Sequence, residues 1–123
     1  ALPPAALAAS RAALDLVAGD LSYKDELWRN IDHMRAGLLS AGFDLKKSVG
    51  PIVPIVVGRD VDAVKMQRML MKKGCFLQAI RPPTVPTGTS RLRLTVVRGF
   101  SREQMDSAIE AITQAGRRMK LVP

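Results

Sequence analysis

The apolar side chains of this 123-residue chain first recur at helical spacing. Residues 5–18 are rich in alanine and leucine and follow two prolines, which predicts a helix because proline is well tolerated in a first helical turn. A second helix is predicted from Ser22, a candidate N-cap with Asp25 at capping-box spacing, to Gly42, which suits a left-handed C-terminal cap. Its expected core-facing stripe consists of Trp28, Ile31, Met34 and Leu38.

Two short apolar runs then predict strands with a helix between them. Pro51–Val57 is almost entirely apolar, and Pro54 places this strand at a sheet edge or a bulge because proline has no N–H to donate. Asp60 is the candidate N-cap of the following helix, which we expect to end at Gly74. The second strand is expected over residues 75–80.

The last third of the chain changes from a loop to a strictly alternating strand. Residues 81–90 are predicted to be a loop, since three prolines and a glycine prevent regular structure. The next strand places Leu92, Leu94 and Val96 on its core face and Arg91, Arg93 and Thr95 on the other. Ser101 and Gln104 repeat the capping-box pattern and begin an amphipathic helix. The order α-α-β-α-β-β-α predicts an α+β fold, a small mixed or antiparallel sheet of about three strands with helices packed on one face.

Composition excludes several kinds of site. Hydrophobic residues make up 47% and charged residues 24% of the chain, which is ordinary for one globular domain, and no apolar run is long enough to span a membrane. Cys75 is the only cysteine and His33 the only histidine, which excludes an internal disulfide and a cysteine-based or multi-histidine metal site. We interpret Cys75 as a small buried side chain and His33 as an ordinary surface residue. A cytoplasmic location is expected, and the start at Ala1 suggests that the chain is cut from a longer protein.

The net charge of +8 is concentrated in one part of the chain. Residues 63–102 contain no acid, whereas basic side chains recur through them. Such a stretch attracts nucleic acid, phosphorylated cofactors, carboxylates or acidic partners, although a solvated surface explains it equally well. The five aromatic residues are not interleaved with the basic ones, which weakens an interpretation as a module that binds single-stranded nucleic acid.

The segment from residue 79 to residue 95 carries the clearest chemical signal. Its proline-rich loop presents Arg81 and Thr84, and the strand that follows presents Arg91 and Arg93 on one face. A guanidinium group is suited to bidentate binding of a carboxylate or phosphate, so the segment predicts an anion-binding site. Pairing of Arg91 and Arg93 with acids on other elements would explain the same pattern.

The string KGCFLQAIRPPTVPTGTSRLRLTV resembles the C-terminal part of the 8-amino-7-oxononanoate synthases. LPP, AALDL and PIVPIVVG upstream support the resemblance, which covers essentially the whole chain. These enzymes are a branch of the α-oxoamine synthases, which use pyridoxal phosphate and have the fold-type-I aminotransferase architecture. The R-x-R strand is common to the larger family, whereas AIRPPTVP favours the oxononanoate synthase branch.

The resemblance implies which residues take part in a site. It implies that residues 1–20 form a helix leading from an absent large domain and that residues 21–123 form the C-terminal small domain. Arg93 would bind the carboxylate of the amino-acid substrate, Thr84 would lie at the substrate site, and Arg81 would lie beside it. The lysine that forms a Schiff base with pyridoxal phosphate is expected upstream, so we expect no catalytic residue in this chain and no activity from it alone.

The resemblance also implies a reaction and partners. The parent enzyme would be a homodimer that condenses L-alanine with pimeloyl-CoA, or with a carrier-protein thioester, and releases carbon dioxide. No nucleic acid or membrane partner is expected. Gly99 and Phe100 stand where the family often has a small residue followed by histidine. The alternatives are therefore a sibling enzyme (2-amino-3-ketobutyrate CoA ligase, 5-aminolevulinate synthase or serine palmitoyltransferase) and, more distantly, a small basic nucleic-acid- or anion-binding module.

Overall fold

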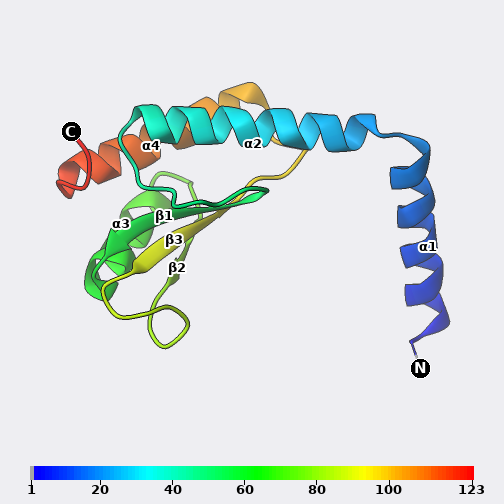
Figure 1. Ribbon diagram of the computed structural model, residues 1–123, viewed down its shortest axis with the longest axis horizontal. Helices are drawn as coiled ribbons and strands as arrows, with labels where there is room; N and C mark the ends of the chain where they lie inside the picture. Colours follow the sequence, from blue (N-terminus) through cyan, green and yellow to red (C-terminus); the bar gives the residue numbers. More distant parts are fainter. Residues whose placement is uncertain (1) are drawn as a thin grey trace.

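A computed structural model describes residues 2–123 and contains four helices and three strands (Figure 1). In chain order the elements are α1 (Pro4–Gly19), α2 (Ser22–Ser40), β1 (Ile52–Gly58), α3 (Asp60–Met71), β2 (Gln78–Ile80), β3 (Ser90–Thr95) and α4 (Arg102–Arg118). This order confirms the predicted succession of helices and strands. No helix among the described residues is both long and apolar enough to cross a membrane.

The three strands form one antiparallel sheet in the order β1-β3-β2. The central strand β3 pairs along its length with β1, where Leu94 lies opposite Val53 and Leu92 opposite Ile55. All four of these side chains are buried, so one face of the sheet is part of the core. Pro54 lies on the edge strand β1, as its missing N–H predicts, and the register shifts between Val56 and Gly58 at the end of that strand.

The helices cover the buried face of the sheet, which confirms the predicted α+β arrangement. Helix α3 packs against all three strands, and α4 packs against both α3 and α2. Met66, Leu70 and Ile112 are completely buried between these layers. Helix α4 begins with the predicted capping box, in which the Gln104 N–H donates to Ser101 Oγ at 3.1 Å and the Ser101 N–H donates to Gln104 Oε1 at 2.9 Å.

Helix α1 stands apart from the sheet and from the other helices (Figure 1). None of its residues is buried, and it exposes four large apolar side chains: Leu7, Leu14, Leu16 and Val17. A 16-residue helix without tertiary packing is only marginally stable in water. Its apolar side chains have no covering surface among residues 2–123.

Two capping predictions were wrong in detail. Ser22 is the first helical residue of α2 rather than its N-cap, which is Leu21, and the Ser22 N–H donates to the Asp20 carboxylate at 2.9 Å. Hydrogen bonds from the side chain and the backbone of Ser22 lower the pKa of Asp20 below its ordinary value. Asp60 is likewise the first helical residue of α3 rather than its N-cap, which is Arg59.

The structure also differs from the sequence predictions in the surroundings of two side chains and in the length of one strand. Trp28 is 41% exposed, whereas Ile31, Met34 and Leu38 are buried on the face of α2 that packs toward α4. His33 is partly buried rather than an ordinary surface residue, with 17% of its side chain exposed, and its Nε2 lies 2.6 Å from Asp106 Oδ1 on α4. The second strand is shorter than expected, since only Gln78–Ile80 pairs with β3.

The close packing at Gly116 in α4 generates a stability prediction. A Cβ atom at this position would lie 2.5 Å from Cζ of the buried Phe43 ring and 3.0 Å from Val122 Cγ2. We expect Gly116→Ala to lower the free energy of unfolding, measured by urea denaturation, by about 1–3 kcal/mol, because overpacking outweighs the gain in helix propensity of about 1 kcal/mol. Gly19→Ala is the control, since no heavy atom lies within 4 Å of its Cβ position. Equal stabilisation by both substitutions would contradict the prediction.

Candidate substrate-binding site

The sheet face opposite the core carries polar and cationic side chains. The central strand β3 contributes Arg91, Arg93 and Thr95 to this open face, while Leu92 and Leu94 point into the core. None of the strand residues on the open face is an acid; they are Ile52, Pro54, Val56, Gln78, Ile80, Arg91, Arg93 and Thr95. The alternation predicted from the sequence therefore directs both guanidinium groups away from the core.

Arg93 is exposed at the centre of this face and has a neutral partner. Its Nη2 donates to Gln78 Oε1 at 2.6 Å, across the strand pair in which Gln78 lies directly opposite Arg93. No carboxylate of residues 2–123 lies within ion-pair distance of Arg93. Pairing with an acid, which the sequence left open, does not occur at this residue within the described chain. The cation thus remains available to an external anion.

Arg91 lies on the same face but is held by the preceding loop. Its Nε donates to the Thr89 carbonyl at 3.0 Å and its Nη2 donates to Thr89 Oγ1 at 3.1 Å. These contacts fold the side chain back on the start of β3 and leave it half-buried. The structure therefore distinguishes the two arginines, since Arg91 braces the loop whereas Arg93 is exposed.

Arg81 and Thr84 lie together in an exposed turn that follows β2. The Thr84 N–H donates to the Arg81 carbonyl at 3.0 Å, and the Pro82–Pro83 peptide bond between them is cis. Arg81 follows Ile80, which pairs with Arg91, whereas Arg93 pairs with Gln78 at the other end of β2. The structure thus brings Arg81 and Thr84 together but places them at the opposite end of β2 from Arg93.

A groove of about 830 Å³ runs beside Arg93 between the ends of the strands and the start of α4. Arg93 and Gln78 lie on its lining together with Phe76, Cys75 and Phe100. Phe76 is 72% exposed, which is unusual for an aromatic ring and leaves an apolar surface next to the guanidinium group. Lys73, Glu103 and Gln104 also lie on the lining. The groove therefore combines an apolar wall with a few charged and amide side chains, as small-molecule pockets commonly do.

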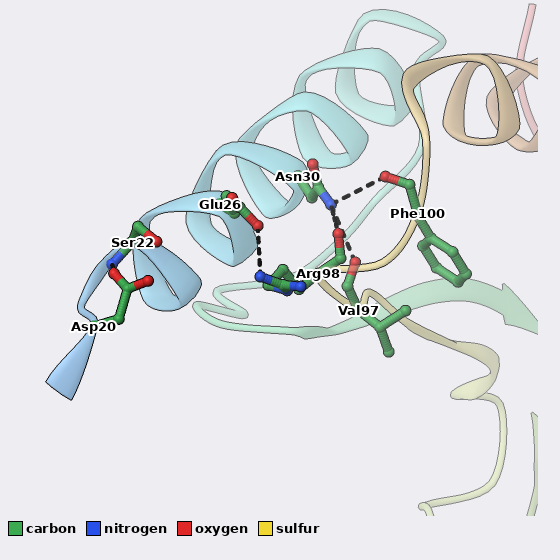
Figure 2. Close-up of polar contacts among 7 residues, drawn as sticks. All are labelled: Asp20, Ser22, Glu26, Asn30, Val97, Arg98 and Phe100. Carbon is green, nitrogen blue, oxygen red and sulfur yellow. Dashed lines mark hydrogen bonds and ion pairs between the residues drawn. The ribbon is translucent and has the colours of Figure 1, made fainter. Parts of the chain in front are cut away.

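The end of β3 is fastened to helix α2 by polar contacts (Figure 2). Asn30 Nδ2 donates to the carbonyl groups of Val97 and Arg98 at 3.1 and 3.0 Å, and lies 3.4 Å from the Phe100 carbonyl. Arg98 Nη1 lies 3.1 Å from Glu26 Oε2, and its guanidinium carbon lies 4.4 Å from the centroid of the Tyr23 ring. We call these contacts the α2 clamp. It fixes the turn that begins two residues after β3.

The residues of the site are not those of a metal centre. No group of three or more histidine, cysteine or acidic side chains able to hold a metal lies among residues 2–123.

The family model for aminotransferase class I and II matches residues 1–112. The chain belongs to the aminotransferase class I and II family. It is 44% identical over 94% of its length to an 8-amino-7-oxononanoate synthase from Methylococcus capsulatus, and 38% identical over 98% to one from Alkaliphilus oremlandii. These matches confirm the resemblance stated from the sequence. The chain spans 30% and 31% of the lengths of these two relatives.

Solved structures of the same family share the fold. The chain matches a serine palmitoyltransferase from Sphingomonas wittichii with a TM-score of 0.77 and 25% identity, covering 82% of this chain and 26% of that one. A second match, an 8-amino-7-oxononanoate synthase from Francisella tularensis, has a TM-score of 0.81 and 21% identity, and covers 98% of this chain and 35% of that one. The predicted architecture, that of the small domain of a fold-type-I enzyme, is therefore confirmed.

Pyridoxal phosphate, the cofactor that this fold family implies, does not fit the open face by itself. The cofactor requires an amine for its aldehyde and an acid near its ring nitrogen, and the strand residues of the open face include no lysine and no acid. Lys73, which lines the groove, donates its ammonium group to Gln114. The open face thus offers Arg93 for a carboxylate but lacks the lysine and the acid that the cofactor requires.

The residues that sequence analysis missed are Gln78, Thr89 and Asn30. Each acts through a contact across strands, within a loop or between elements distant in the sequence. Gln78 is two residues before Ile80 in the predicted strand, so its face followed from the alternation. The strand register that places Gln78 opposite Arg93 could not be predicted from the alternation.

The α2 clamp generates a prediction at Asn30. We expect Asn30→Ala to lower the free energy of unfolding by about 1 kcal/mol, because the carbonyl groups of Val97 and Arg98 lose a protein donor. Asn30→Asp should cost more at neutral pH, since a carboxylate would face carbonyl oxygens, and the difference should narrow as the pH falls and the carboxyl group becomes protonated. Urea denaturation at pH 7 and pH 4 measures both effects. A more stable Asp variant at pH 7 would exclude this role.

The groove-lining Cys75 generates a prediction about reactivity. Burial raises the pKa of its thiol, so the folded protein holds less thiolate at a given pH than an unburied cysteine does. We expect iodoacetamide to alkylate Cys75 more slowly than it alkylates the same chain in denaturant, and the rate to titrate with a midpoint above that of the denatured chain. Mass spectrometry over pH 7–10 measures this. Identical pH profiles in the two states would contradict the assignment.

Proposed function

We propose that this chain is the C-terminal, substrate-carboxylate-binding part of a pyridoxal-phosphate-dependent α-oxoamine synthase. The observation that carries the proposal is Arg93, a cation on an exposed sheet face whose partner in the described chain is an uncharged amide. Membership of the aminotransferase class I and II family supports a parent enzyme whose substrates include an amino acid. When bound in the parent, the cofactor would stabilise negative charge at the substrate's α-carbon.

We propose that the parent condenses L-alanine with pimeloyl-CoA, or with the carrier-protein thioester, to give 8-amino-7-oxononanoate and carbon dioxide. The similarity to relatives that bear the name 8-amino-7-oxononanoate synthase supports this choice. A homodimeric, cytoplasmic parent belongs to the same proposal and rests on the resemblance. The catalytic lysine belongs to the remainder of the parent, so the 123-residue chain by itself would be inactive.

We also propose the domain division at residue 20. Helix α1 has no buried residue and exposes an apolar surface, which fits a helix that packs on the large domain. From residue 21 onward, the α2 clamp and the contacts between α2 and α4 tie the chain to the sheet. Residues 1–20 would then lead from the large domain and residues 21–123 would form the small domain.

Arg93 would act by binding and orientation. Its guanidinium group retains four N–H donors besides the one directed to Gln78, which suffices for a two-point contact with a carboxylate. A fixed carboxylate sets the orientation of the adjacent Cα–carboxyl bond, and such orientation contributes to rate by holding one reactive geometry. Thr84 and Arg81, in their shared turn, would contact the same substrate from the other end of β2.

A serine palmitoyltransferase is the second candidate. A serine palmitoyltransferase from S. paucimobilis with bound pyridoxal phosphate matches the chain at a TM-score of 0.76 and 25% identity. Gly99 and Phe100, which depart from the family pattern, lie next to the groove, where Phe100 forms part of the lining. Assays of the full-length protein with alanine or serine, and with thioesters of different chain length, separate the two candidates.

The role of Arg93 predicts a large effect on amino-acid binding. In the full-length enzyme, we expect Arg93→Ala to weaken L-alanine binding by about 10- to 150-fold, since a hydrogen bond to a charged group contributes about 1.5–3 kcal/mol. Arg93→Lys should recover part of the loss, because lysine keeps the charge but not the planar fork. Titration of the cofactor absorbance with L-alanine measures the affinity.

Arg118→Ala is the matched control for this substitution. Arg118 is an exposed arginine near the end of α4, so its removal changes the net charge equally without touching the open face. We expect wild-type affinity from this variant. If Arg93→Ala left L-alanine affinity and turnover unchanged, the proposed function of this face would be wrong.

A further inference from the structure

Gln78 is held opposite Arg93 by the pairing of β2 with β3. The two residues are direct partners in the antiparallel register, so their side chains leave the sheet side by side on the open face. Gln78 Oε1 and Arg93 Nη2 lie 2.6 Å apart. Because a guanidinium group has no acceptor, the amide must present its oxygen to Arg93, and its NH₂ group must point elsewhere.

The chemistry of this partner differs from that of the arginines that form ion pairs in the structure. Arg59 and Arg98 are paired with the carboxylates of Asp62 and Glu26, which neutralise them. At Arg93 an amide takes one hydrogen bond and adds no charge. The guanidinium is thereby oriented while its full positive charge is kept.

An exposed arginine without a partner occupies many rotamers, and ordering them costs affinity when a ligand binds. Gln78 removes part of that cost in advance, because it fixes Nη2 on one side of the strand pair. The contribution of Gln78 is therefore the orientation of the guanidinium group.

We infer that Gln78 is a positioning residue that orients Arg93 for a substrate carboxylate and contributes selectivity for that carboxylate. This inference rests on the proposed function, in which Arg93 binds the carboxylate of the amino acid. It assigns to Gln78 an effect that exists only through Arg93 and only for ligands that carry a carboxylate.

The test uses the full-length enzyme with its cofactor, and L-alanine and L-alaninamide as ligands. L-Alaninamide keeps the amine and side chain but lacks the carboxylate. Affinities are measured from the cofactor absorbance for the wild type, Gln78→Ala, Gln78→Glu, Arg93→Ala and the Gln78→Ala/Arg93→Ala double variant. Arg118→Ala is again the control, since it removes an exposed side chain of α4 outside the open face and the groove lining.

We expect Gln78→Ala to weaken L-alanine binding by about 3- to 10-fold, the range of one hydrogen bond, and to leave L-alaninamide binding unchanged. Gln78→Glu should weaken L-alanine binding more than Gln78→Ala does, because it places a negative charge beside Arg93. The double variant should bind L-alanine no more weakly than Arg93→Ala does, since the effect of Gln78 passes through Arg93.

The outcomes separate the inference from the proposed function. If Arg93→Ala does not weaken L-alanine binding, the proposed function fails. If Arg93→Ala weakens it but Gln78→Ala has no effect, affects both ligands equally or adds to Arg93→Ala, then the inference about Gln78 fails and the proposed function stands. Circular dichroism of each variant identifies loss of folding, and Gln78→Glu, which keeps the length of the side chain, then serves as the deciding variant.

Discussion

The pairing of the central strand β3 with both of its neighbours is the constraint on which the rest of the structure depends. Side chains alternate along a strand, so the register that buries Leu92 and Leu94 also places Arg93 on the opposite face. A slip of one residue would bury the guanidinium and expose the leucines. The hydrophobic effect that stabilises the core therefore also fixes the direction of the cation, and the candidate site needs no separate scaffold.

Contacts at both ends of β3 add to this constraint. At its start, Arg91 bonds to Thr89 and braces the proline-rich loop against the strand. Beyond its end, Asn30 holds the turn that leads to α4. A six-residue strand that is paired on both edges and fastened beyond each end has little freedom to shift, which keeps Arg93 in one position relative to helix α2.

The sequence predicted those parts of the fold that are determined by neighbouring residues. The alternation of leucine and arginine in β3 and the capping box of Ser101 and Gln104 are local patterns, and both are present. The exposure of Trp28 depends on which face of α2 the other elements cover. The hydrogen bond that Asp20 accepts from the Ser22 N–H depends on where the chain turns after α1. The Gln78–Arg93 contact depends on strand register, which no local pattern specifies.

The absence of acids from residues 63–102 acquires a physical meaning from this arrangement. A carboxylate on β2 or in the following loop would lie within reach of Arg93 at a high effective concentration and would compete with any free carboxylate. The acids that pair with arginines in the structure, such as Glu26 with Arg98 and Asp62 with Arg59, lie outside this stretch. Within this stretch the partner of Arg93 is thus an uncharged amide, and Glu103, which lines the same groove directly after the stretch, makes no ion pair with Arg93. By charge alone, residues 63–102 resemble a general basic surface. Their lack of acids is better explained by its effect on Arg93, which has no carboxylate partner within this stretch.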